Sequence, residues 1–206
     1  MTGKRRFLAL GDSYTIGEGV AAGARWPVQL AVMLGHDGLA VEEPRIVART
    51  GWTTDELLAA IELADPPIDH DYDLVTLLIG VNDQYRGRGV GSFRAGFERL
   101  LERAATFAAT AEHIVVVSIP DWSVTPFARN DRRGAASIAR EIDEFNAAAR
   151  ALSESRGAAF VDITDISRGA ADNLELLAAD ALHPSAAMYA RWAPVIRPAA
   201  ANALGA

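Results

Sequence analysis

Four short polar segments carry groups that could together transfer an acyl group. Ser13 offers a hydroxyl, Asn82 a neutral amide, and Asp180 stands three residues before His183. Gly51 has no side chain, so its backbone N–H can approach a ligand closely. Acyl transfer needs a hydroxyl nucleophile, an imidazole to move its proton, a carboxylate to orient the imidazole and donors for the oxyanion. No single segment is specific for acyl transfer, so the prediction depends on the order of the segments and on the elements that position them.

Short apolar runs alternate with longer amphipathic runs along the chain, which predicts βα units and a mostly parallel sheet. Five strands are predicted, at Phe7–Leu10, Arg45–Ala48, Leu74–Ile79, Ile114–Ile119 and Ala159–Ile163. Helices are predicted at Trp26–Leu34, Thr54–Leu63, Phe93–Phe107, Ile138–Ser153 and from about Ala186 onward. Because ligands of open parallel sheets bind at the carboxyl ends of the strands, the polar segments that follow the first three strands are expected to meet there.

Composition indicates a folded chain. The 206 residues are 50% hydrophobic and 23% charged, with no repeat or long linker, so we expect one domain over residues 1–206. The third and fourth predicted strands are continuous apolar runs, typical of a sheet covered on both faces, which predicts a three-layer α/β/α sandwich. The net charge of −7 disfavours nucleic acid and anionic lipid as partners. Without cysteine there is no disulfide, thiol nucleophile or thiolate metal site.

The beginning of the chain imitates a signal peptide without matching one. The basic residues 4–6 precede an apolar run of only four residues, Phe7–Leu10, whereas a signal peptide needs about 7–15. No stretch approaches the ~18 apolar residues of a membrane span. We therefore expect a cytoplasmic protein without stable membrane association, whose oligomeric state the sequence leaves open.

The motifs, taken in order, resemble those of the SGNH or GDSL hydrolases, a family of serine esterases and acylhydrolases. They occur here as Gly11-Asp12-Ser13-Tyr14, as Gly51, as Gly80-Val81-Asn82-Asp83 and as Asp180-Ala181-Leu182-His183. The resemblance spans most of the chain and implies a compact flavodoxin-like fold. Tyr14 stands where the family's name has leucine, a change that removes no reacting group.

By this resemblance Ser13 is the nucleophile, His183 the general base and then acid, and Asp180 the partner of His183. The oxyanion hole would consist of the N–H groups of Ser13 and Gly51 and the side chain of Asn82. The rate should then fall on the acid side, where the imidazole is protonated.

Neighbouring residues have supporting or alternative interpretations. Asp12 is expected to satisfy loop N–H groups, and Asp83 to hold the loop that positions Asn82. Trp52 and Tyr85 could line the substrate pocket, although core packing explains either equally well.

Two polar stretches outside the motifs invite other interpretations. The basic loop 86–91 could meet an anionic substrate group, but it lacks the pattern of a phosphate loop, and a solvated hinge is favoured. The stretch 69–73 gathers aspartates around His70, and a solvated loop is favoured over a metal site.

We therefore predict an esterase that cleaves a small-molecule carboxylic ester, with a preference for short acyl chains and no metal or organic cofactor. A carbohydrate O-acetylesterase, a thioesterase or a lysophospholipase would use the same residues, and only the pocket walls would distinguish them. From a different class, a non-catalytic ligand-binding protein could keep the fold, but it would be expected to have lost part of this constellation.

Overall fold

The computed structural model describes residues 3–206, and its centre is a five-stranded sheet in which every neighbouring pair is parallel. The strands are β1 (Phe7–Gly11), β2 (Arg45–Ala48), β3 (Leu74–Leu78), β4 (Ile114–Val117) and β5 (Ala159–Val161). Their spatial order is β2-β1-β3-β4-β5, which is the flavodoxin-like order. The predicted α/β architecture with a flavodoxin-like sheet is thereby confirmed.

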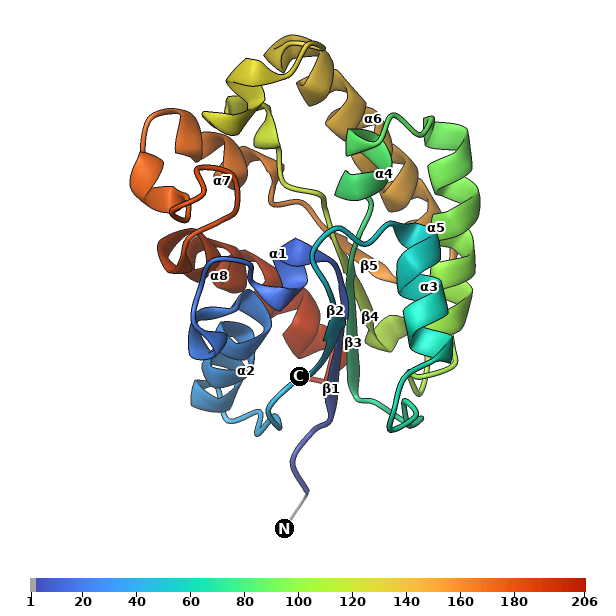
Figure 1. Ribbon diagram of the computed structural model, residues 1–206. Coiled ribbons are helices and arrows are strands. Elements are labelled where there is room, and N and C mark those ends of the chain that lie inside the picture. The colour runs from blue at the N-terminus through green and yellow to red at the C-terminus, as the bar shows by residue number, and fades with distance from the viewer. Residues whose placement is uncertain (1–2) are drawn as a thin grey trace.

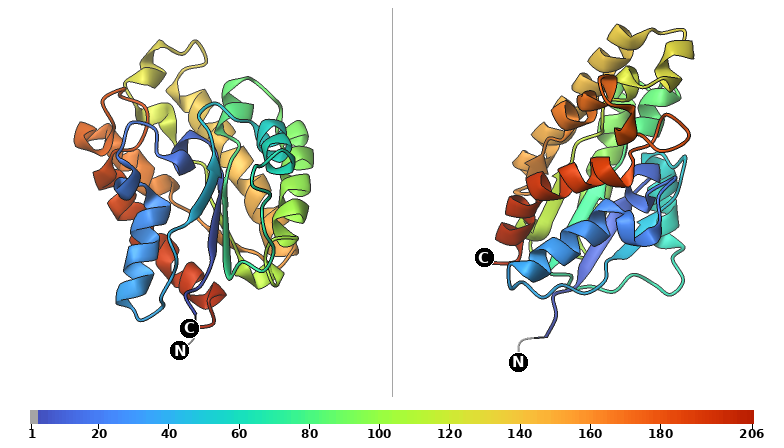
Figure 2. Two further views of the ribbon diagram at one scale, coloured as in Figure 1. Left: turned by 60° about the horizontal axis from the view of Figure 1, so that its bottom comes forward. Right: turned by 90° about the vertical axis from the view of Figure 1, so that its left-hand side faces the viewer.

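Helices cover both faces of the sheet (Figures 1 and 2). Helices α2 (Trp26–His36) and α8 (Ala186–Ala203) pack together on one face, and α3 (Thr54–Glu62), α5 (Val90–Ala105) and α6 (Ala135–Ser155) cover the other. Covered in this way, β1, β3 and β4 are buried along their whole length, whereas the edge strands β2 and β5 are largely half-buried. This explains why the third and fourth predicted strands are continuous apolar runs.

All five predicted strands and the long helices occur, with differences at their ends. The last three strands end one or two residues earlier than predicted, because the chain leaves the sheet there to form loops and short helices at its carboxyl edge. The sequence analysis missed α1 (Ser13–Ile16), α4 (Val81–Tyr85) and α7 (Thr164–Arg168), and also several 3-10 turns, including η3 (Trp122–Val124) and η4 (Phe127–Asn130). Helices of four or five residues are too short to show a periodic pattern.

The strand order creates a switch point at the carboxyl edge between β1 and β3. The chain leaves β1 toward β2 on one side and returns to β3 on the other, so the loops after β1 and β3 diverge. Such a divergence opens a crevice in which ligands of this fold class bind. In Figure 1, α1 and α4 lie at this edge, while the start of β1 and the C-terminus lie toward the opposite one.

Candidate active site

Ser13 lies at the first position of α1, directly after β1. The preceding Asp12 caps this helix, because its carboxylate accepts a hydrogen bond of 3.0 Å from the N–H of Tyr14. Gly17 ends the helix after one turn in a left-handed conformation. The serine is 4% exposed, and its side chain lines the cavity described below. A capped turn therefore fixes the hydroxyl at the end of the first strand.

Helix α4 holds Asn82 against the loop that contains Gly51. The Nδ2 atom of Asn82 donates to the carbonyl of Trp52 at 2.9 Å, which leaves its second hydrogen free. Gly51 has a φ of +89°, a conformation that favours glycine, and it lines the same cavity as Asn82. The amide of Asn82 and the backbone of Gly51 thus line the same cavity.

Asp180 and His183 form a pair on the loop before α8. The Oδ2 atom of Asp180 lies 2.5 Å from Nδ1 of His183, and its Oδ1 accepts the N–H groups of Leu182 and His183 at 3.0 Å each. Burial raises the pKa of Asp180, but these hydrogen bonds outweigh it and hold the pKa below its ordinary value. The carboxylate therefore remains charged and fixes both the turn and the imidazole.

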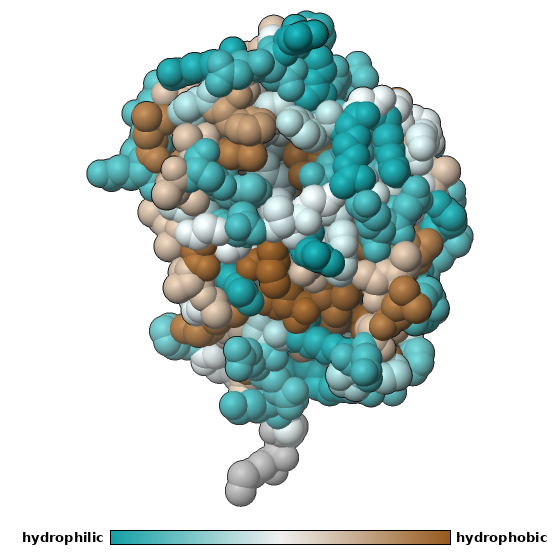
Figure 3. All heavy atoms as spheres, in the orientation of Figure 1, coloured by the Kyte–Doolittle hydropathy of each residue, from teal (hydrophilic) through white to brown (hydrophobic). Residues whose placement is uncertain are grey.

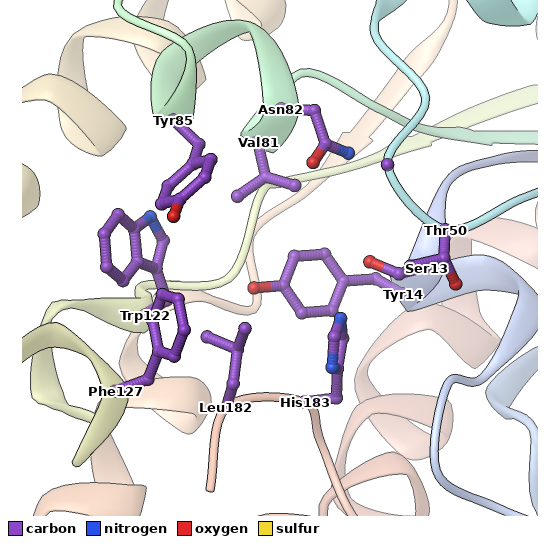
Figure 4. Close-up of a pocket in the computed structure, with 11 residues that line it drawn as sticks. Ser13, Tyr14, Thr50, Val81, Asn82, Tyr85, Trp122, Phe127, Leu182 and His183 are labelled. Atoms are coloured by element: carbon purple, nitrogen blue, oxygen red, sulfur yellow. The ribbon is translucent and has the colours of Figure 1, made fainter. Parts of the chain in front are cut away.

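These groups surround one cavity of about 190 Å³ (Figures 3 and 4). In Figure 4 the imidazole of His183 extends toward Ser13, and Asn82 approaches from the other side. The lining is mostly apolar or aromatic and consists of Ser13, Tyr14, Thr50, Gly51, Val81, Asn82, Tyr85, Trp122, Phe127, Leu182 and His183. A hydroxyl, an imidazole paired with a carboxylate, a side-chain amide and a glycine backbone thus line one mostly apolar cleft.

Two buried carboxylates support the loops without lining the cavity. Asp83 accepts hydrogen bonds from the N–H and hydroxyl of Thr54 at 2.9 Å each, which ties α4 to the start of α3. Burial raises the pKa of Asp83, although the bonds from Thr54 and the charge of Arg88 oppose it. Asp12 is fully buried, and desolvation raises its pKa to about 8. Both residues lie where supporting roles were expected.

The two aromatic residues named as pocket candidates differ in position. Tyr85 lines the cavity and is 48% exposed. The structure does not place Trp52 among the lining residues: its carbonyl accepts the bond from Asn82, and its ring packs against the core beside β2. The turn that presents Gly51 to the cavity directs the next side chain away from it.

Sequence reasoning missed the contributions of Gln84 and Arg86. Arg86 donates to the carbonyl of Gly51 at 2.7 Å and pairs with Glu56 at 3.1 Å. Gln84 is buried and accepts the indole N–H of Trp122 at 3.0 Å. Both residues follow shortly after Asn82 in the sequence. No local sequence pattern, however, indicates that their side chains contact segments far away in the chain.

The side chains of the two polar stretches outside the motifs have partners within the protein. Arg88, in the basic loop after α4, pairs with Asp55 at 2.9 Å and with Asp83 at 3.1 Å. His70 bonds the carbonyl of Thr106, and residues 3–206 contain no group of three His, Asp or Glu side chains that could hold a metal ion. In the same part of the chain, no helix is both long and apolar enough to cross a membrane.

With this geometry in place, comparison with known proteins decides the family. Residues 9–191 match the profile of the GDSL-like Lipase/Acylhydrolase family. The chain belongs to this family. No curated protein matches the chain significantly.

Solved structures share the fold over nearly the whole chain. An extracellular lipase from Streptomyces rimosus aligns with a TM-score of 0.72 at 20% identity, covering 95% of this chain and 99% of the lipase. TesA aligns with a TM-score of 0.71 at 20% identity, covering 97% of this chain and all of TesA. AlinE4, an SGNH-hydrolase family esterase, aligns with a TM-score of 0.65 at 24% identity over 100% of both chains. These likenesses establish the SGNH hydrolase fold.

Proposed function

We propose that this GDSL-family protein is a serine esterase that hydrolyses carboxylic esters through an acyl-enzyme on Ser13. The observation that carries the proposal is the meeting of Ser13, the Asp180–His183 pair and the Gly51 and Asn82 donors at one cavity. Each is a required part of acyl transfer, and each comes from a different segment of the chain.

In the first step, Nε2 of His183 takes the proton of Ser13 as Oγ attacks the ester carbonyl. The oxyanion moves toward the N–H of Gly51, the free hydrogen of the Asn82 amide and the N–H of Ser13. The imidazolium then protonates the departing alcohol, and the charge of Asp180 stabilises it meanwhile. Water repeats the sequence on the acyl-enzyme and releases the carboxylic acid.

The test is release of 4-nitrophenol from acetate, butyrate and octanoate esters by the wild type and by Ser13→Ala and His183→Ala. Both substitutions should abolish nearly all turnover, because serine and histidine act as a unit in such sites.

The control is a circular dichroism spectrum of each variant, which should match that of the wild type. Hydrolysis by Ser13→Ala at the rate of the wild type, in protein free of contaminating esterase, would refute the assignment. The ranking of the three esters tests the preference for short acyl chains expected from the sequence against the larger acyl group that the size of the cavity favours.

A further inference from the structure

The end of the cavity remote from Ser13 has a construction that ester hydrolysis alone does not require. Tyr85, Trp122 and Phe127, here called the aromatic wall, close the cavity at that end (Figure 4). Their ring centroids lie 5.7 Å (Tyr85–Trp122), 6.2 Å (Tyr85–Phe127) and 5.9 Å (Trp122–Phe127) apart. Three separate segments, α4, η3 and η4, thus each contribute one ring to a single apolar surface.

We propose that the aromatic wall is an acyl subsite for an uncharged apolar acyl group about the size of a benzene ring, with Gln84 as a positioning residue for Trp122. This inference rests on the proposed function and names the substrate class of the same site.

The direction of the cavity assigns it to the acyl side of the ester. During acyl transfer the carbonyl oxygen must face Gly51 and Asn82, and the leaving oxygen must face His183, which protonates it. The remaining substituent of the carbonyl carbon is the acyl group, and it extends away from both. In Figure 4 the cavity leads from Ser13 across the ring of Tyr14 to the aromatic wall, between α4 and the loop that carries His183.

The size of the cavity favours a group larger than acetyl. A dry protein cavity of about 150 Å³ accommodates benzene, and this cavity measures about 190 Å³ over its whole length from Ser13 to the aromatic wall, so one ring is comparable in size to the space available. A methyl group would leave most of this apolar surface in contact with water. The rings of the aromatic wall can pack against an aromatic ring of the substrate, because aromatic rings prefer edge-to-face or offset-stacked contacts.

The charge distribution excludes an ionic acyl group. None of the described residues that line the cavity is Asp, Glu, Lys or Arg. The rings also contact each other, which leaves no cage for an ammonium group, and the guanidinium of Arg133 already lies 5.7 Å from the ring centroid of Tyr85 and 5.4 Å from that of Trp122. A charged acyl group would lose its hydration there, and the nearby guanidinium of Arg133 already pairs with Asp131 and Glu141.

A hydrogen-bonded network behind the wall holds Trp122 in place. The indole N–H donates to Oε1 of Gln84 at 3.0 Å, and Nε2 of Gln84 donates to Glu141 at 2.5 Å. Arg133 pairs with Glu141 at 3.2 Å and with Asp131 at 2.8 Å. Because Gln84 and Trp122 are both buried, replacing either group would leave the other unsatisfied. The ring of Trp122 is therefore held in place before a substrate binds.

The test compares kcat/KM for 4-nitrophenyl acetate, hexanoate and phenylacetate in the wild type, Phe127→Ala and Phe160→Ala. The wild type should prefer phenylacetate and hexanoate to acetate. Phe127→Ala should lower the ratio of phenylacetate to acetate roughly tenfold, as expected when an apolar pocket loses one large contact. Phe160 lies on β5, does not line the cavity and is also covered by an arginine, so Phe160→Ala should keep the ratio of the wild type.

The role of Gln84 is tested by a double-mutant cycle on the same ratio. Gln84→Met removes the acceptor of the indole N–H, and Trp122→Phe removes the donor. Each single substitution should lower the ratio of kcat/KM for phenylacetate to that for acetate. The double variant should have the same ratio as Trp122→Phe, because the two residues act through one bond. Additive losses would show that Gln84 does not act through Trp122.

Three outcomes would overturn the subsite. One is a wild type that prefers acetate, and another is an unchanged ratio in Phe127→Ala. The third concerns phenyl acetate and benzyl acetate, which differ only in their alcohol. If Phe127→Ala changed the preference between these two esters but not the ratio of phenylacetate to acetate, the alcohol rather than the acyl group would lie against the wall. Absence of hydrolysis that depends on Ser13 for every ester would instead refute the proposed function itself, and with it this inference.

Discussion

The residues around His183 show how a carboxylate can fix a turn and an imidazole at the same time. One oxygen of Asp180 accepts two backbone N–H groups, and the other faces Nδ1 of His183. Between them Ala181 has a φ of +59°, a conformation that costs a residue with a side chain about 1–2 kcal/mol. The bonds of Asp180 offset this cost, so the loop is shaped by the residue that also orients the imidazole.

Asp180→Asn separates these two roles. The asparagine oxygen can still accept the two N–H groups, so the fold and the turn should persist. Its amide, however, would donate to Nδ1 and leave the proton on Nε2, where it blocks general-base action. The equivalent change lowers kcat about 10⁴-fold in a serine protease, and we expect a loss of at least roughly 10²-fold here. Steady-state kinetics at pH 8 measure it, with circular dichroism as the folding control, and a rate within threefold of the wild type would contradict the role of Asp180.

Arg86 contacts the loop of Gly51 from outside the cavity. Its guanidinium donates to the carbonyl of Gly51, so it restrains the peptide next to the N–H that we propose as an oxyanion donor. We infer that Arg86 is a positioning residue for this donor. Arg86→Met should lower kcat roughly tenfold with little change in KM, because the donor matters most in the transition state.

The control for Arg86 is Arg99→Met. Arg99 forms an exposed ion pair with Asp55 on the same side of the molecule, so its loss removes a comparable charge without touching Gly51. Arg86→Lys should recover part of the rate, since an ammonium can still donate to the carbonyl. If Arg86→Met and Arg99→Met lowered kcat equally, the cause would be the lost positive charge and not the lost contact with the loop of Gly51.

At the scale of elements, one short helix organises the site. Helix α4 carries Asn82 toward the Gly51 loop, Asp83 toward α3, Gln84 toward Trp122 and Tyr85 into the aromatic wall. Gly80 precedes it with a φ of +124°, and a side chain there would collide with Phe93 and Ile119. The glycine therefore allows the chain to turn sharply from β3 into a helix that four different contacts then hold.

Elements with a strong periodic or apolar pattern could be predicted from the sequence, and those that position the site could not. The strand before Ser13 is a buried apolar run, and Thr53 and Glu56 form a capping box at the start of α3. Helix α4 has no such pattern, because its residues contact segments 29 to 57 positions away. The motifs therefore predict which residues gather, while the aromatic wall and its network become visible only in three dimensions.

At the scale of the whole molecule, the burial of Asp12 beside Ser13 destabilises the charged form of its carboxyl group. Asp12 is completely enclosed at the boundary between the sheet and α1, and its Oδ2 has no hydrogen-bond partner among the described residues. Desolvation raises its pKa to about 8, assisted by the charge of Asp83. Over much of the neutral range the folded protein therefore holds a proton on Asp12 that the unfolded chain releases near its ordinary pKa of 3.8.

This difference makes the stability of the fold depend on pH. Because the pKa is raised on folding, the contribution of Asp12 is fully present below pH 3.8 and is lost as the pH rises toward 8, with a slope of up to about 1.4 kcal/mol per pH unit. Asp12→Asn keeps the acceptor for the N–H of Tyr14 but cannot ionise. Its melting temperature should exceed that of the wild type, by an amount that grows from pH 5 to pH 8. Thermal unfolding followed by circular dichroism at both pH values measures the difference, and a constant offset would mean that the carboxyl of Asp12 does not change its charge on unfolding.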